Sequence, residues 1–285
     1  MFNLFPSQLY TTYKGSNYRA LSPYIWSRVA SNLMTPDGND QGYFIGSDFR
    51  NFGKTTAVGS NIGRYADTSG PYLSYEDTSD TIAQLETNRN GEIVFTTAAT
   101  DNNEDWLVPG GATSVMGVIS TTAGSDKLLA FECRFKIGVL AETGFFIGLS
   151  EEGLAAANTL VDDTGALASK DMIGFHCPMH ASIATCSFVH RKATQAAVTV
   201  ISGLKTMVAD TYYNMGFVFD PKKPTSQRIT VYLDNAEQTT YTTGTQISAA
   251  TFPDGEELLP LFGLKTGAAG VKTLTVDSWA FYQEG

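Results

Sequence analysis

From about Asn61 to the C-terminus, the sequence is a series of short strand-like runs separated by clusters of Gly, Asp, Asn and Thr. Alternating polarity and frequent β-branched and aromatic residues favour pleated strands in these runs. The clearest alternation puts Phe131, Cys133, Phe135 and Ile137 on one face. The expected strands cover residues 92–97, 113–121, 128–137, 144–150, 172–177, 183–190, 197–202, 212–219, 228–233, 258–264 and 274–282. This series predicts an all-β, antiparallel β-sandwich or jelly roll, with little helix beyond residues 151–159.

Residues 1–60 differ from the rest because aromatic side chains alternate irregularly with Ser, Asn, Gly and Pro. Only residues 24–33 have the pattern of a short helix. We therefore divide the chain into an N-terminal arm, residues 1–60, and a body, residues 61–285. Aromatic side chains bury large areas with few rotors to immobilise, so we expect the arm to lie on its own body, a sister subunit or a larger assembly. The residues expected to make these contacts are Phe2, Phe5, Tyr10, Tyr13, Tyr18, Tyr24 and Trp26.

The charge balance narrows the class of partner. The 285 residues include 19 Lys and Arg against 29 Asp and Glu, which gives a formal net charge of -10. Because phosphate binding needs clustered Lys and Arg, we expect no nucleic-acid partner. The sequence has no apolar run of about 18 residues, so we expect no membrane-spanning helix. The N-terminus has no signal-peptide pattern, which predicts synthesis into the cytoplasm.

The sharpest cluster of metal-ligand residue types is Cys177, His180, Cys186 and His190, with His176 beside the first cysteine. Its spacing superficially resembles a zinc knuckle. Both flanking runs are expected to be strands, however, and adjacent side chains of a strand point to opposite faces. The cysteines are therefore better interpreted as buried apolar side chains. We expect no metal ion and no cofactor.

The order of the strand-like runs is more specific than any single motif. The runs are LAFECRFKIG, ETGFFIGLSEEG, DMIGFHC, YYNMGFVFDPKK, RITVYLDN and LTVDSWAFYQ. In this order, residues 70–285 resemble the concanavalin-A-like jelly roll of the LamG and lectin type. With its aromatic arm, acidic body and closing strand at Trp279, the whole chain resembles the head decoration (cement) proteins of tailed bacteriophages.

This resemblance implies a viral structural protein, and not an enzyme, that binds and stabilises the outer surface of a bacteriophage capsid. The implied partners are the major capsid protein of the same virion and further copies of the chain, with a trimer favoured over a dimer. The implied location is the outer capsid surface of the virion, after synthesis in the host cytoplasm. An acidic body suits that position because the packaged genome would repel a protein facing it.

The alternative is a carbohydrate-binding virion module that attaches to host or environmental glycans. A lectin-type site needs exposed aromatic rings beside polar side chains, and the best single candidate is Trp106 with Glu104 and Asp105. Tyr212 and Tyr213 are further candidates. Residues 162–163, two adjacent aspartates, are a candidate calcium pair.

A hydrolase is a third possibility because concanavalin-like folds also include glycosidases. Such an enzyme needs two carboxylates separated across a cleft. The carboxylate pairs at 104–105, 151–152 and 256–257 do not show this one-face pattern inside an expected strand. They are interpreted as solvated loop charges.

Overall fold

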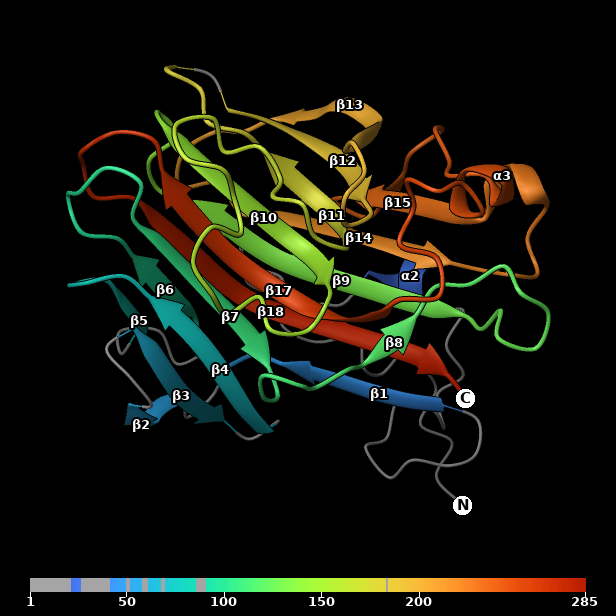
Figure 1. Ribbon diagram of the computed structural model, residues 1–285, viewed down its shortest axis with the longest axis horizontal. Helices are drawn as coiled ribbons and strands as arrows, with labels where there is room; N and C mark the ends of the chain where they lie inside the picture. The colour runs from blue at the N-terminus through green and yellow to red at the C-terminus, as the bar shows by residue number, and fades with distance from the viewer. Residues whose placement is uncertain are drawn as a thin grey trace.

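The computed structural model describes residues 22–26, 42–49, 52–57, 61–67, 70–85, 91–182 and 184–285. Within these residues the chain is almost entirely antiparallel β-structure in two sheets packed face to face (Figure 1). The predicted all-β jelly-roll sandwich is thereby confirmed. Two short α-helices in the described part, α2 (Pro23–Trp26) and α3 (Gly244–Ile247), lie outside the sheets. Neither has the length or the apolar run to cross a membrane.

One sheet has eight strands in the order β16-β15-β14-β9-β18-β6-β5, and β1 also pairs with β18. The long β18 organises this sheet. Its first part pairs with β6 and its second part with β1, while β9 runs along its other side. The strands are β1 (Gly42–Ser47), β5 (Thr81–Gln84), β6 (Ile93–Thr96), β9 (Leu129–Ile137), β14 (Tyr213–Phe219), β15 (Ile229–Leu233), β16 (Ala236–Glu237) and β18 (Thr273–Glu284).

The other sheet has ten strands in the order β13-β12-β11-β10-β17-β7-β4-β3-β2, and β8 also pairs with β17. Its strands are β2 (Gly53–Ala57), β3 (Ile62–Asp67), β4 (Gly70–Glu76), β7 (Glu104–Pro109), β8 (Gly117–Val118), β10 (Thr143–Ser150), β11 (Met172–Cys177), β12 (Thr185–Arg191), β13 (Val198–Thr206) and β17 (Glu257–Thr266). Because β10 is antiparallel to both of its neighbours, its end lies beside the starts of β11 and β17.

The core between the sheets is rich in aromatic rings. Phe131 of β9 stacks on Phe262 of β17 with ring centroids 6.3 Å apart, which joins one sheet to the other. Phe217 and Trp279 extend this group, each 5.7 Å from one of the two central rings. A second apolar cluster lies on the outer face of the ten-stranded sheet, where apolar residues of segment 151–171 pack over it. We call this segment the covering loop. With both faces covered, β10 is buried along its whole length.

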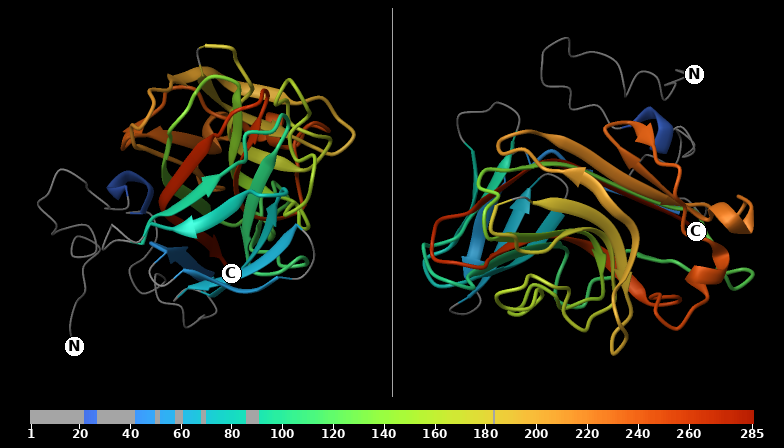
Figure 2. Two further views of the ribbon diagram at one scale, coloured as in Figure 1. Left: turned by 90° about the vertical axis from the view of Figure 1, so that its left-hand side faces the viewer. Right: turned by 90° about the horizontal axis from the view of Figure 1, so that it is seen from above.

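Strand β9 shows how the sequence places its side chains. Phe131, Cys133, Phe135 and Ile137 all belong to the inter-sheet core, as their alternation predicts. The residues between them point outward, where α2 packs on the eight-stranded sheet (Figure 2). An outward-facing apolar patch on a sheet needs a cover. Ile25 and Trp26 of α2 cover it.

Some expectations differ from the structure. Residues 42–47 and 53–57 were expected in the arm but form β1 and β2, each paired into a sheet, so the boundary at residue 60 does not coincide with the edge of the sandwich. Residues 151–159 form turns and bends instead of a helix, and their Leu154 and Ala155 pack in the apolar cluster on the outer face of the ten-stranded sheet. Residues 113–121 provide only the two-residue β8.

Candidate functional site

The predicted sugar-binding residues Trp106, Glu104 and Asp105 lie in β7, inside the ten-stranded sheet between β17 and β4. All three are buried, and the Trp106 ring has no exposed surface. It packs in the apolar cluster that contains Phe146 and Leu154 of the covering loop. A sugar stacks on an exposed ring face. These residues therefore do not form the exposed stacking platform that the sequence suggested.

Glu104 instead belongs to a buried polar network beneath the covering loop. Its carboxylate lies 3.4 Å from Lys265 Nζ, and it accepts hydrogen bonds from Trp106 Nε1 at 2.8 Å and from the backbone N–H of Asn158. Lys265 also contacts Asp162 of the covering loop at 2.6 Å. Burial raises the pKa of Glu104, although the bond from Asn158 and the charge of Lys265 oppose the rise. The network fastens the covering loop to the sheet.

Asp105 lies on the opposite face of β7 from Glu104, the face that Leu107 shares with the inter-sheet core. Burial raises its pKa well above the usual value, and the nearby carboxylates of Asp80 and Glu76 raise it further. Neither oxygen of Asp105 has a hydrogen-bond partner among the described residues. These surroundings favour the uncharged carboxylic acid over the carboxylate.

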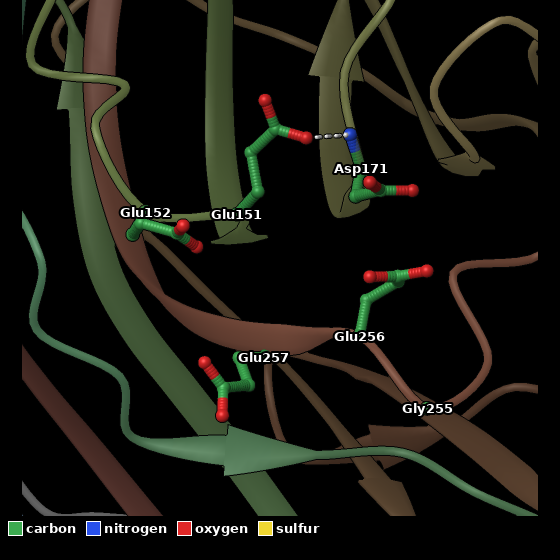
Figure 3. A pocket seen from close by; sticks show the side chains of 6 residues that line it. All are labelled: Glu151, Glu152, Asp171, Gly255, Glu256 and Glu257. Carbon is green, nitrogen blue, oxygen red and sulfur yellow. Dashed lines mark hydrogen bonds between the residues drawn. The ribbon is translucent and has the colours of Figure 1, made fainter.

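An acidic pocket of about 500 Å³ lies at the edge of the ten-stranded sheet where β10 ends and β11 and β17 begin. In Figure 3 the side chains from these strand ends surround a common space. We call this space the acidic pocket. It is lined by Glu151, Glu152, Asp171, Gly255, Glu256 and Glu257. The antiparallel pairing of β10 with both neighbours brings together carboxylates that are about a hundred positions apart in the sequence.

The charges of this pocket are only partly compensated. Lys170 pairs with Glu151 at 3.2 Å and Lys192 pairs with Glu256 at 2.9 Å. The backbone N–H of Asp171 donates a hydrogen bond to Glu151 at 3.0 Å (Figure 3). Burial raises the pKa of the Asp171 carboxyl, and the neighbouring glutamates raise it further. Because carboxylates only accept hydrogen bonds, the pocket suits ligands that present hydroxyl groups or cations.

No group of three or more His, Cys, Asp or Glu side chains in the described ranges could hold a metal ion. Cys177 and Cys186 lie in the inter-sheet core. The adjacent His176 points to the other face, where its Nε2 is 2.7 Å from the carbonyl oxygen of Gly165. Burial lowers the pKa of His176 to about 4, so the ring is neutral at neutral pH. His176 thus lies on the opposite face of the sheet from Cys177 and Cys186. His190 instead lies on the core face, beside Ile173 and 4.8 Å from the ring of Phe252.

The other sugar- and calcium-binding candidates contact the protein itself. Asp162 pairs with Lys265, and Asp163 accepts a hydrogen bond from an asparagine that precedes β7. Tyr213 is buried in the inter-sheet core, and the half-buried Tyr212 lies against the guanidinium group of Arg134. These residues are not brought together in one site.

The structure places the predicted contact residues of the arm in different surroundings. Tyr24 and Trp26 lie in α2 on the outer face of the eight-stranded sheet (Figure 2). Trp26 is completely buried there, whereas Tyr24 is 62% exposed. Trp26 therefore contacts its own sheet and is not free for a capsid contact in this structure, and Tyr24 remains accessible. The remaining predicted contact residues, Phe2, Phe5, Tyr10, Tyr13 and Tyr18, lie outside the described residues.

Residues Ser22–Trp26, which we call the anchor segment, are held by the buried carboxylate of Glu132 on β9. The Ser22 backbone N–H donates to both carboxylate oxygens at 3.0 Å, and Trp26 Nε1 donates to Oε2. Burial raises the pKa of Glu132 to about 7, although the bonds from Ser22, Trp26 and the Asn214 side chain oppose the rise. Strand alternation predicts that the Glu132 side chain points to the face of the sheet opposite that of Phe131. No sequence signal, however, links Glu132 to Ser22, 110 positions earlier.

No family model matches this chain, and no curated protein matches it in sequence. Among solved structures, a protein of unknown function from Shewanella oneidensis MR-1 has a TM-score of 0.49 and 16% identity, over 93% of this chain and 95% of that chain. Peanut lectin has a TM-score of 0.43 and 13% identity, over 85% and 97% of the two chains. The CBM2 module of the evolved Dit protein of Lactobacillus casei BL23 phage J-1 has a TM-score of 0.43 and 13% identity, over 74% and 81%.

Proposed function

We propose that this protein is a structural, non-catalytic component of a bacteriophage virion that binds and stabilises the outer surface of the capsid. Its partners in this proposal are the major capsid protein of the same virion and further copies of the chain. The observation that carries the proposal is the anchor segment. It is fixed to the outer face of the eight-stranded sheet, so the aromatic residues that precede it in the sequence are attached to a stable sandwich at that face.

Two further properties support an arm that binds another surface. Tyr24 keeps 62% of its surface exposed although its neighbour Trp26 is completely buried. A tyrosine combines a large apolar ring with a polar tip and few rotors, which suits it to protein interfaces. The net charge of -10 suits a body that stands on the outside of a particle, away from the negatively charged genome.

Removing residues 1–21 is expected to weaken binding to capsids assembled from the major capsid protein by at least about 30-fold, since one central aromatic contact contributes about 2 kcal/mol or more. The truncation ends before the anchor segment and β1, so every strand in the described part of the chain is kept. Co-sedimentation with empty capsids over a range of protein concentrations measures the affinity.

The matched control for this truncation is Glu257→Gln, which removes an exposed charge from the acidic pocket. It is expected to bind capsids like the natural chain. Undiminished capsid binding by the truncated chain would overturn the proposal that the arm makes the contact.

Carbohydrate binding is a second candidate function, and the acidic pocket is the observation that favours it. The pocket is open at the sheet edge and presents five carboxylates, with Glu152 and Glu257 exposed. Carboxylate oxygens are strong acceptors for the hydroxyl groups of a sugar. This candidate site replaces Trp106, Glu104 and Asp105, which are buried.

If the pocket binds a glycan, Glu257→Gln is expected to weaken that binding about tenfold, because a hydrogen bond to a charged group contributes about 1.5 kcal/mol or more. Asp101→Asn is the matched control, since it removes one exposed charge outside the pocket. A glycan array identifies the ligand, and titration calorimetry then compares the variants. Equal affinity of Glu257→Gln and Asp101→Asn, or no glycan bound above background, would exclude the pocket as the sugar site.

A further inference from the structure

The surface under the anchor segment is shaped to receive it. Glu132 of β9 lies opposite Gly216 of β14 on one side and Ala280 of β18 on the other. A Cβ atom on Gly216 would lie 2.5 Å from Cδ1 of Ile25, so the glycine makes room for the isoleucine. The small residues thus leave an opening around the carboxylate. We call this surface the socket, and its residues are Ala130, Glu132, Gly216, Val218, Ala280 and Tyr282.

The socket combines apolar contact with a specific polar one. Ile25 and Trp26 are 1% and 0% exposed and pack in the same cluster as the apolar socket residues. At its centre, Glu132 accepts the backbone N–H of Ser22 and the indole N–H of Trp26. A buried carboxylate needs such donors, because burial without partners is strongly unfavourable. The socket therefore recognises a peptide segment with an indole and a free backbone N–H.

The connection between the anchor segment and β1 has more residues than are needed to join them within one copy. The rings of Trp26 and Phe44 are in edge-to-face contact, with centroids 5.3 Å apart. Seventeen residues separate these two positions in the sequence. Fully extended, that length of chain spans up to roughly 55 Å. The connection can therefore carry the anchor segment to the socket of a neighbouring copy.

We propose that copies of this chain exchange anchor segments, so that Ser22–Trp26 of one copy occupies the Glu132 socket of the next. An exchanged segment makes the same contacts as one seated in its own chain, which is why exchange is a low-cost route to oligomers. High local concentration, as between copies held side by side, favours the exchange further. The proposal goes beyond capsid binding and holds whichever surface residues 1–21 contact.

Two complementary variants test the exchange. The anchor variant, Ile25→Ala with Trp26→Ala, keeps an intact socket but lacks the side chains with which the anchor segment binds it. The socket variant, Glu132→Lys, keeps its segment and presents a cation to the N–H donors of Ser22 and Trp26. Mass measurement by analytical ultracentrifugation is made on each variant alone and on their equimolar mixture, in the absence of capsids.

The natural chain is expected to form oligomers, and each variant alone is expected to be a monomer of 30.7 kDa. The mixture is expected to give a species of twice that mass, containing one copy of each variant. A monomeric natural chain, a mixture that stays monomeric, or variants that still form the natural oligomer would each overturn the exchange. Val218→Lys, on the same face, replaces Glu132→Lys if that variant does not fold. Because no capsid is present, this outcome is independent of the capsid-binding result.

Discussion

Replacing Lys265 with methionine is expected to lower the free energy of unfolding by about 3–5 kcal/mol, the usual cost of removing one partner from a buried ion pair. Lys265 Nζ lies 3.4 Å from Glu104, and the two side chains are 1% and 2% exposed. Methionine has a similar length and no charge, so it would leave the Glu104 carboxylate buried without its counterion. It would also release Asp162, through which Lys265 holds the covering loop. Urea unfolding at neutral pH measures the change.

The double variant Lys265→Met with Glu104→Gln is the control for this prediction. It removes both charges and is expected to recover a large part of the lost stability, because no buried charge is left uncompensated. Burial already raises the pKa of Glu104, and loss of Lys265 raises it further. The single variant is therefore expected to approach the natural chain in stability as the pH falls and Glu104 takes up a proton. Equal losses in the single and double variants at every pH would show that Lys265 acts only through the packing of its stem.

The strands from β9 onward show how much of the fold could be predicted from the sequence. Strands β9, β10, β11, β14, β15, β17 and β18 begin and end within two residues of the predicted runs. Their side chains alternate or are continuously apolar because one or both faces of each strand are covered. Burial of this kind leaves a local pattern in the sequence.

Strand β7 could not be predicted because its burial depends on distant residues. Its first two residues, Glu104 and Asp105, are carboxylates, which are typical of exposed loops. Glu104 is tolerated inside the sheet because Lys265, far along the sequence, lies directly across from it on β17. Asp105 is tolerated because its surroundings favour the uncharged form. No local pattern carries that information.

The acidic pocket was missed for a related reason. Its carboxylates were recognised in the sequence as separate pairs at 151–152 and 256–257. Alternation predicts that β10 and β17 are strands, but it does not predict that they are neighbours. The pairing of Ser150 with Leu259 places the two acidic pairs at the same sheet edge. Register is a property of the folded sheet, so the convergence is visible only in three dimensions.

The anchor segment and the acidic pocket belong to different sheets, which keeps the two candidate functions experimentally separate. The anchor segment rests on β9, β14 and β18 of the eight-stranded sheet. The pocket lies at the ends of β10, β11 and β17 of the ten-stranded sheet. Changes at Glu132 and at Glu257 therefore act on different contacts, and each serves as a control for the other.

The contribution of Glu132 to stability is expected to fall by about 3 kcal/mol between pH 4.5 and pH 7. Burial raises its pKa from 4.5 to about 7 in the folded chain. Below pH 4.5 the carboxyl is protonated whether the chain is folded or unfolded. Between these values only the unfolded chain loses the proton, so stability falls as the pH rises. Above pH 7 both states are ionised and the contribution is constant. Arg134, two residues along β9 from Glu132, is paired with Asp277 at 2.6 Å.

Glu132→Gln isolates this effect because glutamine has the same shape and does not titrate. Glu104, Asp105 and Asp171 also have raised pKa values, but they are common to both proteins and cancel in the difference. Urea unfolding of the two proteins from pH 4.5 to pH 8 gives that difference. A difference that does not change with pH would mean that Glu132 is not desolvated by the anchor segment. The expected dependence on pH instead means that the anchor segment is bound less stably in the socket at neutral pH than in mild acid. At neutral pH, burying Glu132 under the anchor segment requires either taking up a proton or burying a charge.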